Sequence, residues 1–291
     1  MEKIGWVAIL ITGFIFQTEV IAMDPGTATG TLTIKGKKAI PLKYAYALQY
    51  DNQEGILDGP ELRIFLTDQE VVQDSTIPPH NFFDLDGPVM QLVHEGKVHG
   101  IVFKLDSRNP LKGMNGTLLY PPANPTESFL YFTHAGTKPA FSKLQTNNNK
   151  AVGEIAYQSD GSRGFEITAS FNTAILQQEP MTERLEGPKA LESAPVRALL
   201  AFDKACRAGD IEAVRKLSTA QRVKELEAFK AQVGESEFKK TMQMEIPSPE
   251  KRKRQVKQVF IRGTRAVVVG QGEGGKSIDS VVQQNGIWKV E

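Results

Sequence analysis

Val256-Lys-Gln-Val-Phe-Ile261 opens a series of four β-forming runs that ends the chain and decides the fold of its C-terminal part. The other three runs are Arg265-Ala-Val-Val-Val269, Lys276-Ser-Ile-Asp-Ser-Val-Val-Gln283 and Ile287-Trp-Lys-Val290. Asn285-Gly286 between the last two is a strong hairpin signal, because both central residues of a type I′ turn need positive φ. The runs therefore predict an antiparallel meander. Such a sheet must bury one face, and the nearby helical block at residues 195–244 can cover it.

Length and charge set broad limits on the organisation of the chain. With 291 residues it can form two domains that each bury a core. Residues 23–193 carry 15 Lys and Arg against 20 Asp and Glu, whereas residues 194–291 carry 19 against 12. We interpret this asymmetry as solvated surface and docking between domains, and an acidic partner for the basic half is the alternative.

A secretory signal peptide is predicted at residues 1–22. Met1-Glu2-Lys3 precedes an apolar run at residues 4–16, and Val20 and Ala22 stand at the −3 and −1 positions of a cleavage site. The run is too short for a spanning helix, which needs ~20 apolar residues. We therefore expect export to the periplasm or the extracellular space and a mature chain that does not span the membrane, with an uncleaved anchor as the alternative.

Short β-forming runs divided by Gly, Pro, Asn and Asp fill residues 23–176. We predict strands at 30–34, 42–50, 61–66, 89–94, 98–105, 116–120, 128–133, 141–146, 151–157 and 165–171. This spacing is typical of an all-β sandwich or barrel. The alternating pairs Gly30–Gly36 with Ile40–Tyr46, and Val152–Tyr157 with Phe165–Phe171, resemble a β-sandwich module that precedes other domains in exported bacterial proteins of unknown function. The prediction for this domain is therefore a β-sandwich.

Histidines and acidic residues in this domain suggest one metal site. His94 and His99 flank Glu95-Gly96-Lys97-Val98, and a two-residue turn at Gly96-Lys97 would place the two imidazoles opposite each other. Such a pair could share Zn²⁺ or Cu²⁺, with further ligands from His80, His134, Asp84 or Asp86. The alternative is a solvated polar pair at a hairpin end, and we predict no metal ligands. For residues 74–88, which hold Phe82-Phe83, the prediction is a long loop packed on the sandwich.

A linker is predicted at residues 177–193, where Pro and Gly interrupt a stretch with little apolar content. Helices are predicted at 195–208, at 210–217 with Asp210 as the cap, in a third segment that follows, and at 234–244. Cys206 is the only cysteine and lies on the apolar stripe of the first of these helices, so we interpret it as a core residue. The charged run at 250–254 is predicted to be a solvated strand entry.

Three motifs in residues 194–291 resemble the nuclear transport factor 2-like superfamily, also called SnoaL-like or cystatin-like. They are Ala205-Cys-Arg-Ala-Gly-Asp-Ile-Glu-Ala-Val214 after an amphipathic helix, Gly263-Thr-Arg-Ala-Val-Val268, and Asn285-Gly-Ile-Trp-Lys-Val290. In that family helices pack into the concave face of a curved antiparallel sheet and form a cone with a pocket. The resemblance implies a small α+β domain at residues 194–291.

The resemblance leaves activity open, because the family holds isomerases, dehydratases and cyclases as well as non-catalytic members. Its enzymes use Asp, His and Tyr inside the cone, and residues 194–291 contain neither His nor Tyr. Asp203 and Asp279 are the carboxylates we consider for acid–base chemistry, and we expect each to be a surface or capping group. We therefore predict no catalytic residues and no cofactor.

The sequence favours an exported, non-catalytic binding or interaction protein. Its partner would be an unknown small molecule or protein, and a homodimer through the C-terminal sheet is a further expectation. Nucleic acid is a poor candidate, because no aromatic residue is interleaved with the basic run at 250–254. The alternatives are an acid–base enzyme that uses Asp203 or Asp279, and metal binding by His94 and His99.

Overall fold

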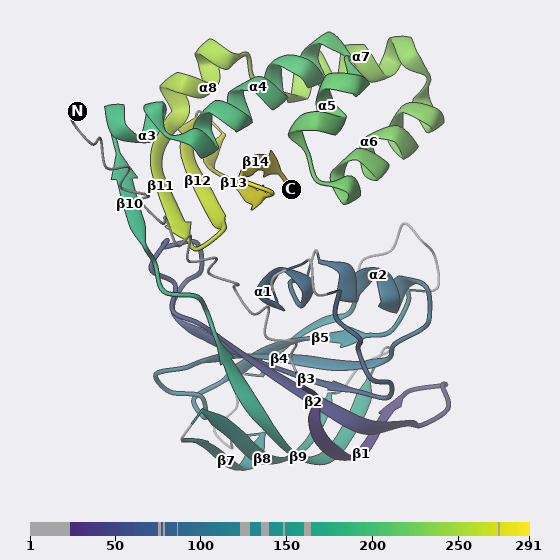
Figure 1. Ribbon diagram of the computed structural model, residues 1–291. Coiled ribbons are helices and arrows are strands. Elements are labelled where there is room, and N and C mark those ends of the chain that lie inside the picture. The colour runs from purple at the N-terminus through teal and green to yellow at the C-terminus, as the bar shows by residue number, and fades with distance from the viewer. Residues whose placement is uncertain are drawn as a thin grey trace, which may run out of the picture. The chain divides into compact units, whose positions relative to one another are not determined.

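The computed structural model describes residues 24–74, 77, 79–85, 87–122, 129–134, 140–147, 149–159, 164–272 and 274–291. The predicted signal peptide and Asp86 lie outside the described residues. The chain divides into two compact units (Figure 1). Unit 1 comprises Met1–Gln49 and Leu62–Leu176, and unit 2 comprises Tyr50–Glu61 and Gln177–Glu291. None of the helices in the described ranges has the length and apolar character needed to cross a membrane.

Unit 1 is built on a single nine-stranded antiparallel sheet. In spatial order its strands are β6 (Tyr131–His134), β5 (Met114–Leu119), β4 (Gly100–Asp106), β3 (Glu61–Thr67), β2 (Ile40–Tyr50), β1 (Gly26–Ile34), β9 (Phe165–Gln177), β8 (Lys150–Ser159) and β7 (Phe141–Asn147). Two short helices, α1 (Pro79–Phe82) and α2 (Pro88–His94), connect β3 to β4. One continuous sheet is present in place of the two stacked sheets of the predicted sandwich. The sequence could not distinguish the two layouts, because buried and exposed residues alternate along a short strand in the same way in either.

The nine-stranded sheet curls until its two ends share one core. Phe132 on β6, at one edge, stacks on Tyr157 of β8 at a centroid distance of 5.8 Å and contacts Phe165 of β9 edge-on at 4.9 Å. Phe103 on β4 lies 5.3 Å from Phe141 on β7, the opposite edge strand. Strands that are far apart in the sheet therefore bury their inner faces against each other, which removes the need for a second sheet.

Strands β2 to β5 are also buried on their outer face, where α1 and α2 lie (Figure 1). Phe83, directly after α1, packs on Tyr46 of β2 at 4.9 Å and on Phe65 of β3 at 5.4 Å. Burial on both faces is clearest in β3, where six of the seven residues are buried. Residues 74–88 were predicted to pack as a loop. Among the described residues of this segment, Pro79–Phe82 form helix α1, and the side chains from His80 to Phe83 are buried.

Residues 89–94 form helix α2 instead of the predicted strand. Pro88 occupies the first helical turn, where its missing N–H is tolerated. Gly96 has φ 66°, and the amide of Lys97 donates to the carbonyl of Leu92, which closes the helix in a Schellman motif. The sequence analysis was wrong here because glycine with positive φ serves a helix end as well as a hairpin turn.

Unit 2 combines a five-stranded antiparallel sheet with six helices in its described part. The strands, in spatial and chain order, are β10 (Glu183–Glu186), β11 (Val256–Arg262), β12 (Arg265–Gly272), β13 (Gly275–Gln284) and β14 (Ile287–Val290). The helices are α3 (Pro188–Glu192), α4 (Ala194–Ala208), α5 (Ile211–Leu217), α6 (Ala220–Val233), α7 (Glu235–Glu245) and α8 (Pro249–Gln255). The predicted meander is confirmed, and Asn285 and Gly286 turn with φ 52° and 77°.

One face of the unit 2 sheet is covered by helices. Helix α4 packs on β12, β13 and β14, and α3 packs on β10 and β11. Ser193 caps α4 by accepting from the amide of Val196, and Gly209 ends it with φ 70°. The core between helix and sheet contains Val196, Leu199, Phe202, Cys206, Val259, Val268, Val281 and Val290.

Two segments of unit 2 are more regular than the sequence indicated. The predicted linker at 177–193 contains β10 and α3, and β10 gains its strand conformation by pairing with β11. The charged run at 250–254 lies in α8, which Ser248 caps by accepting from the amide of Lys251. Strand β10 depends on its partner β11, and helix α8 depends on its cap at Ser248. The local apolar pattern reveals neither of these.

We predict that Gly30→Ala destabilises unit 1 by about 2–3 kcal/mol, because a Cβ there would overpack the sheet. That atom would lie 2.2 Å from the carbonyl oxygen of Thr168, a backbone atom that cannot move aside. Thr31→Ala on the same strand changes an exposed side chain and is the control. Hydrogen exchange of peptides from β1 and β9 measures the difference, and equal protection in both variants would contradict the prediction.

Candidate binding site

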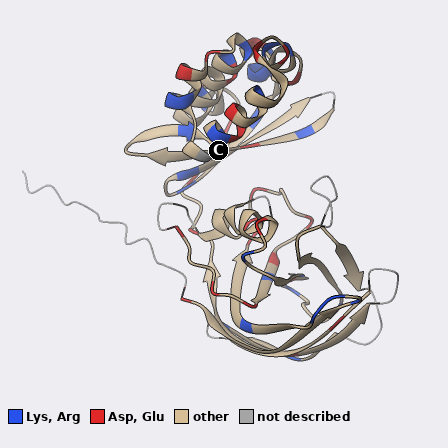
Figure 2. Ribbon diagram, turned by 90° about the vertical axis from the view of Figure 1, so that its right-hand side faces the viewer, with Lys and Arg blue, Asp and Glu red and all other residues tan. Residues whose placement is uncertain are grey.

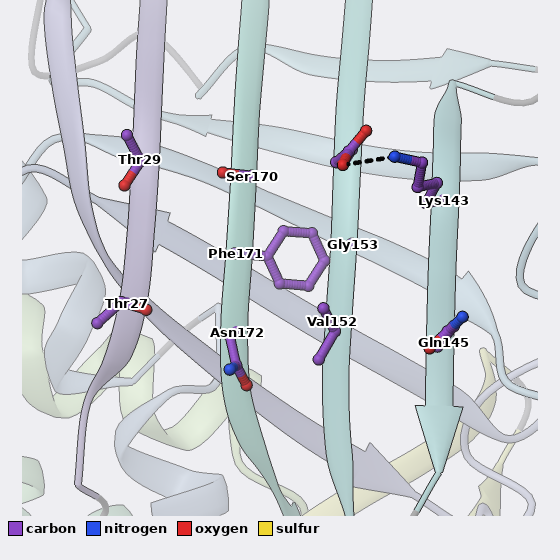
Figure 3. A pocket seen from close by; sticks show the side chains of 10 residues that line it. Thr27, Thr29, Lys143, Gln145, Val152, Gly153, Ser170, Phe171 and Asn172 are labelled. Carbon is purple, nitrogen blue, oxygen red and sulfur yellow. Dashed lines mark hydrogen bonds and ion pairs between the residues drawn. The ribbon is translucent and has the colours of Figure 1, made fainter.

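A shallow groove of about 350 Å³ lies over strands β1, β9, β8 and β7 of unit 1 (Figure 3). Its lining is Thr27, Thr29, Lys143, Gln145, Val152, Gly153, Glu154, Ser170, Phe171 and Asn172. Eight of these side chains lie on the outer face of the sheet, and Gly153 and Phe171 belong to its inner face. Sites that hold small ligands occupy ~300–1,000 Å³, so the groove lies at the lower end of that range.

Strand register arranges the outer lining in two rows that cross four strands. One row is Thr29, Ser170, Glu154 and Lys143, and the other is Thr27, Asn172, Val152 and Gln145. Neighbours within a row are directly opposite each other in their strand pairs, where Cβ atoms are ~5 Å apart. Figure 3 shows the two rows as separate levels along the strands. The groove therefore presents a grid of eight side chains from four strands. These residues lie between positions 27 and 172, and only the sheet brings them together.

Alternation along the strands determines which side chains enter the groove. In β9, Ala169 and Phe171 are buried, and Ser170 and Asn172 between them are exposed. The same period of two operates in β1 and β8. The sequence analysis recognised this alternation but named no site here. Polar residues are common on the outer face of any strand, and the sequence does not show which strands lie side by side or in what register.

Gly153 and Phe171 form the floor of the groove. They are direct partners across β8 and β9, and a Cβ at position 153 would lie only 2.6 Å from Cζ of Phe171. The missing side chain lets the phenyl ring lie against the backbone of β8, between the strands in Figure 3. The ring supports the backbone beneath the two polar rows.

Most of the side chains that line the groove carry a polar group, and the two charged ones form a pair. Lys143 Nζ lies 2.9 Å from Glu154 Oε1, and the side chains are 71% and 49% exposed. An exposed pair of this kind contributes at most ~1 kcal/mol to stability, so its main effect here is to neutralise both groups. The described residues that line the groove include no histidine, cysteine or aspartate. The lining can donate and accept hydrogen bonds, and its one carboxylate, Glu154 opposite Ser170, is paired with Lys143.

A second concentration of polar chemistry lies inside unit 2, between its helices and sheet. Arg252 on α8 donates from Nε to Asp203 on α4 at 2.8 Å and from Nη1 to Asp279 on β13 at 2.9 Å. The Asp203 side chain is 1% exposed and that of Arg252 10% exposed. One guanidinium therefore joins three elements. The expectation of a surface or capping group is wrong for Asp203, whereas the Asp279 side chain, which also bonds to Arg252, is 23% exposed.

Burial sets the protonation balance of this cluster. Burial raises the pKa of Asp203, and the hydrogen bond and charge of Arg252 oppose that rise. Burial also raises the pKa of Asp279 against the charges of Arg252 and Arg222. For Arg252, burial works against the charged form, but the bond to Asp203 and the charges of both carboxylates outweigh it and raise the pKa. Two carboxyls with raised pKa values thus share one permanently charged partner.

The same interior contains Cys206, which is 1% exposed. Burial raises the pKa of its thiol to about 12. A thiol with this pKa is protonated at neutral pH and is a poor nucleophile. The structure thus agrees with the prediction of a small core residue on the apolar stripe of α4.

The loop Tyr50–Glu61 joins β2 to β3 and yet belongs to unit 2. Arg262 on β11 anchors it, donating from Nη2 to Asp51 at 2.6 Å and from Nε to Glu54. Lys276 on β13 donates to the carbonyl of Gly55. Alternation places both Arg262 and Lys276 on the sheet face opposite the helices, so the loop meets that open face.

The hairpin considered as an alternative for His94 and His99 does not form. His94 lies on α2, and its ring centroid is 4.5 Å from that of Phe129. His99 accepts or donates through Nδ1 at 3.1 Å from Asp68, whose other oxygen accepts from the His99 amide. Throughout the part of the chain that the structure describes, no three His, Cys, Asp or Glu residues gather as a metal shell would require. The hairpin that would have aligned the two imidazoles is replaced by the helix end at Gly96.

No family model, curated protein or solved structure matches the chain. The resemblance of residues 194–291 to the nuclear transport factor 2-like superfamily therefore stays a prediction, as does that of residues 28–176 to an exported β-sandwich module.

We predict that Arg252→Met lowers the free energy of unfolding of unit 2 by about 3–5 kcal/mol at pH 7, because it leaves the buried Asp203 and the partly exposed Asp279 without their counter-charge. This loss of stability should be smaller at pH 4.5. Both carboxyls have raised pKa values in the folded state, so the folded protein binds protons more tightly than the unfolded chain, and protonation at low pH removes the unpaired charges. Denaturation followed by Trp288, the only tryptophan after residue 22, measures both values.

Arg254→Met is the matched control, because Arg254 lies on the same helix with an exposed side chain. We expect it to change stability by less than about 0.5 kcal/mol. Equal costs for the two variants, or a cost for Arg252→Met that does not change with pH, would contradict the role assigned to the cluster.

We also predict that Arg262→Leu frees the loop Tyr50–Glu61, because Glu54 is 8% exposed and would lose its ion pair. Amide exchange in peptides from this loop should accelerate by about tenfold or more. Arg184→Leu removes an exposed arginine from the same sheet and should leave the loop unchanged. Similar exchange in both variants would show that Arg262 does not hold the loop.

Proposed function

We propose that the protein is an exported binding protein without a catalytic role, and that it recognises its ligand through the groove on unit 1. The observation that carries this proposal is the lining of the groove. Two rows of hydroxyl, amide and paired charged groups lie within one 350 Å³ depression, and Glu154, the carboxylate opposite Ser170, forms an ion pair with Lys143. Such a surface forms hydrogen bonds to a ligand, and the ion pair occupies the one lining carboxylate that could serve as a base.

Unit 2 is proposed to be a nuclear transport factor 2-like domain that acts as a scaffold. Helices on one face of a five-stranded antiparallel sheet support the assignment. The interior that would hold a pocket in this class contains the cluster of Asp203, Arg252 and Asp279. Part of the opposite face meets the loop Tyr50–Glu61 at Arg262 and Lys276, which leaves less of that face for the homodimer suggested by the sequence.

An acid–base enzyme in unit 2 is the second candidate, and one observation favours it. Asp203 and Asp279 both point into the interior and have raised pKa values because of burial. Their bonds to Arg252 weigh against the idea, since a substrate would have to displace the guanidinium. Asp203 is also 0% exposed, so a ligand reaches it only if the helices move.

The proposal predicts that Ser170→Trp abolishes ligand capture, because a bulky side chain in the middle of the groove fills it. Wild-type protein and the variant, expressed in the native host and purified under identical gentle conditions, are compared by mass spectrometry of the molecules that accompany each. We expect compounds that are enriched on the wild type and absent from Ser170→Trp.

Thr168→Trp is the matched control for this experiment. Thr168 is exposed on the same strand and the same face, but it does not line the groove. The control should retain the ligand. A set of bound molecules that is the same for the wild type and Ser170→Trp, or no bound molecule on the wild type, would contradict the proposed function.

A further inference from the structure

We infer that the groove on unit 1 binds a neutral oligosaccharide, an inference that rests on the proposed binding function of the same site. Its basis is the chemical character, charge and length of the two rows of side chains. Each of these properties excludes a different class of ligand.

Hydrogen-bonding capacity is the first property. Thr27, Thr29 and Ser170 each carry a hydroxyl, and Asn172 and Gln145 each carry an amide. All five groups both donate and accept hydrogen bonds. A sugar hydroxyl has the same dual capacity, so each lining group finds a match in whichever direction the ligand presents its bond. An apolar ligand would leave these groups without partners and lose the free energy of their hydration.

Net charge is the second property. Lys143 and Glu154 neutralise each other within one row, and the remaining lining residues are uncharged. Figure 2 shows few charged residues along the strands of unit 1, in contrast to the many on the helices of unit 2. A phosphate, a polyanion or a polycation would have to break the pair, and the other lining residues carry no charge that could offset the loss. The groove therefore favours a ligand without net charge.

Length and openness are the third property. The rows cross four strands, and three spacings between strands give a span of ~14 Å, about the length of three linked hexose rings. Val152, which is 40% exposed, supplies an apolar surface in the row of amides. The C–H face of a sugar ring can pack on its methyl groups while the hydroxyls bond to Asn172 and Gln145. A chain that runs across the strands uses the whole site, whereas a single sugar uses a third of it.

An extended peptide fits the groove less well than a sugar chain. Peptides that add to a sheet bond to the backbone of an edge strand. Strands β1, β9 and β8 are already paired on both sides, and of the four strands under the groove only β7 is an edge strand. Recognition in the groove therefore depends on side chains on the face of the sheet. A ligand rich in hydroxyl groups can form hydrogen bonds to these side chains without pairing with the backbone.

Titration calorimetry with neutral oligosaccharides of one to six units tests the inference on the full mature chain. The probes are β-1,4-glucans, α-1,4-glucans, mannans and N-acetylated chitin oligomers, with an oligogalacturonate and a deacetylated chitosan as charged comparisons. We expect one neutral series to bind with an affinity that rises up to three units and then levels off. The charged comparisons should bind at least tenfold more weakly.

Substitutions that preserve size assign the binding to the groove. Asn172→Leu and Thr29→Val remove hydrogen-bonding groups without changing volume much, and each should weaken binding by roughly two- to tenfold. Thr33→Val makes the same change on the same face of β1 outside the groove and should have no effect. Ser170→Trp should abolish binding and Thr168→Trp should preserve it.

Three outcomes would overturn the inference. They are failure of every neutral series to bind, stronger binding of a charged series, and sugar binding that survives in Ser170→Trp. If the co-purified molecule that depends on Ser170 is a peptide or another compound, the sugar inference fails and the proposed binding function stands. If no molecule depends on Ser170, both fail together.

Discussion

The shared core of the curled nine-stranded sheet is the constraint on which unit 1 depends. Because strands from both ends of the sheet bury their inner faces together, every strand has one face committed to the same apolar interior. The outer faces then divide into two regions. Helices α1 and α2 cover β2 to β5, and the outer face of β1, β9, β8 and β7 carries alternating polar residues. The groove lies in that second region, where side chains are free of the core and fixed in position by strand register.

The core of unit 2 lies between helices and a sheet, unlike that of unit 1. Its helices and sheet enclose an apolar core, and within it one arginine ties α4, α8 and β13 together through two carboxylates. A buried ion pair is weak evidence for net stability, but removing one partner is costly, so the cluster makes the three elements depend on each other. The residues that looked most like acid–base groups therefore act in the structure as cross-links.

Local pattern predicted many elements correctly, and its errors share one cause. The alternating runs of β8 and β9, the terminal meander and the stripe on α4 could be read from period alone. Residues 89–94 and 250–254 could not, because a glycine or a run of charges fits more than one structure until its neighbours are known. The groove itself was missed, since Thr29 and Lys143 are 114 positions apart and are brought into one row only through three strand pairings.

The sequence by itself determined the strands with one buried face, the turn at Asn285-Gly286 and the burial of Cys206, because these depend on residues close together in the chain. Only the tertiary structure decided that the first sheet is continuous and curled, that Tyr50–Glu61 completes unit 2, and that Asp203 and Asp279 meet Arg252. The physical reason is that alternation sets which face of a strand is buried, whereas long-range register and the need to pair buried charges set what that face meets.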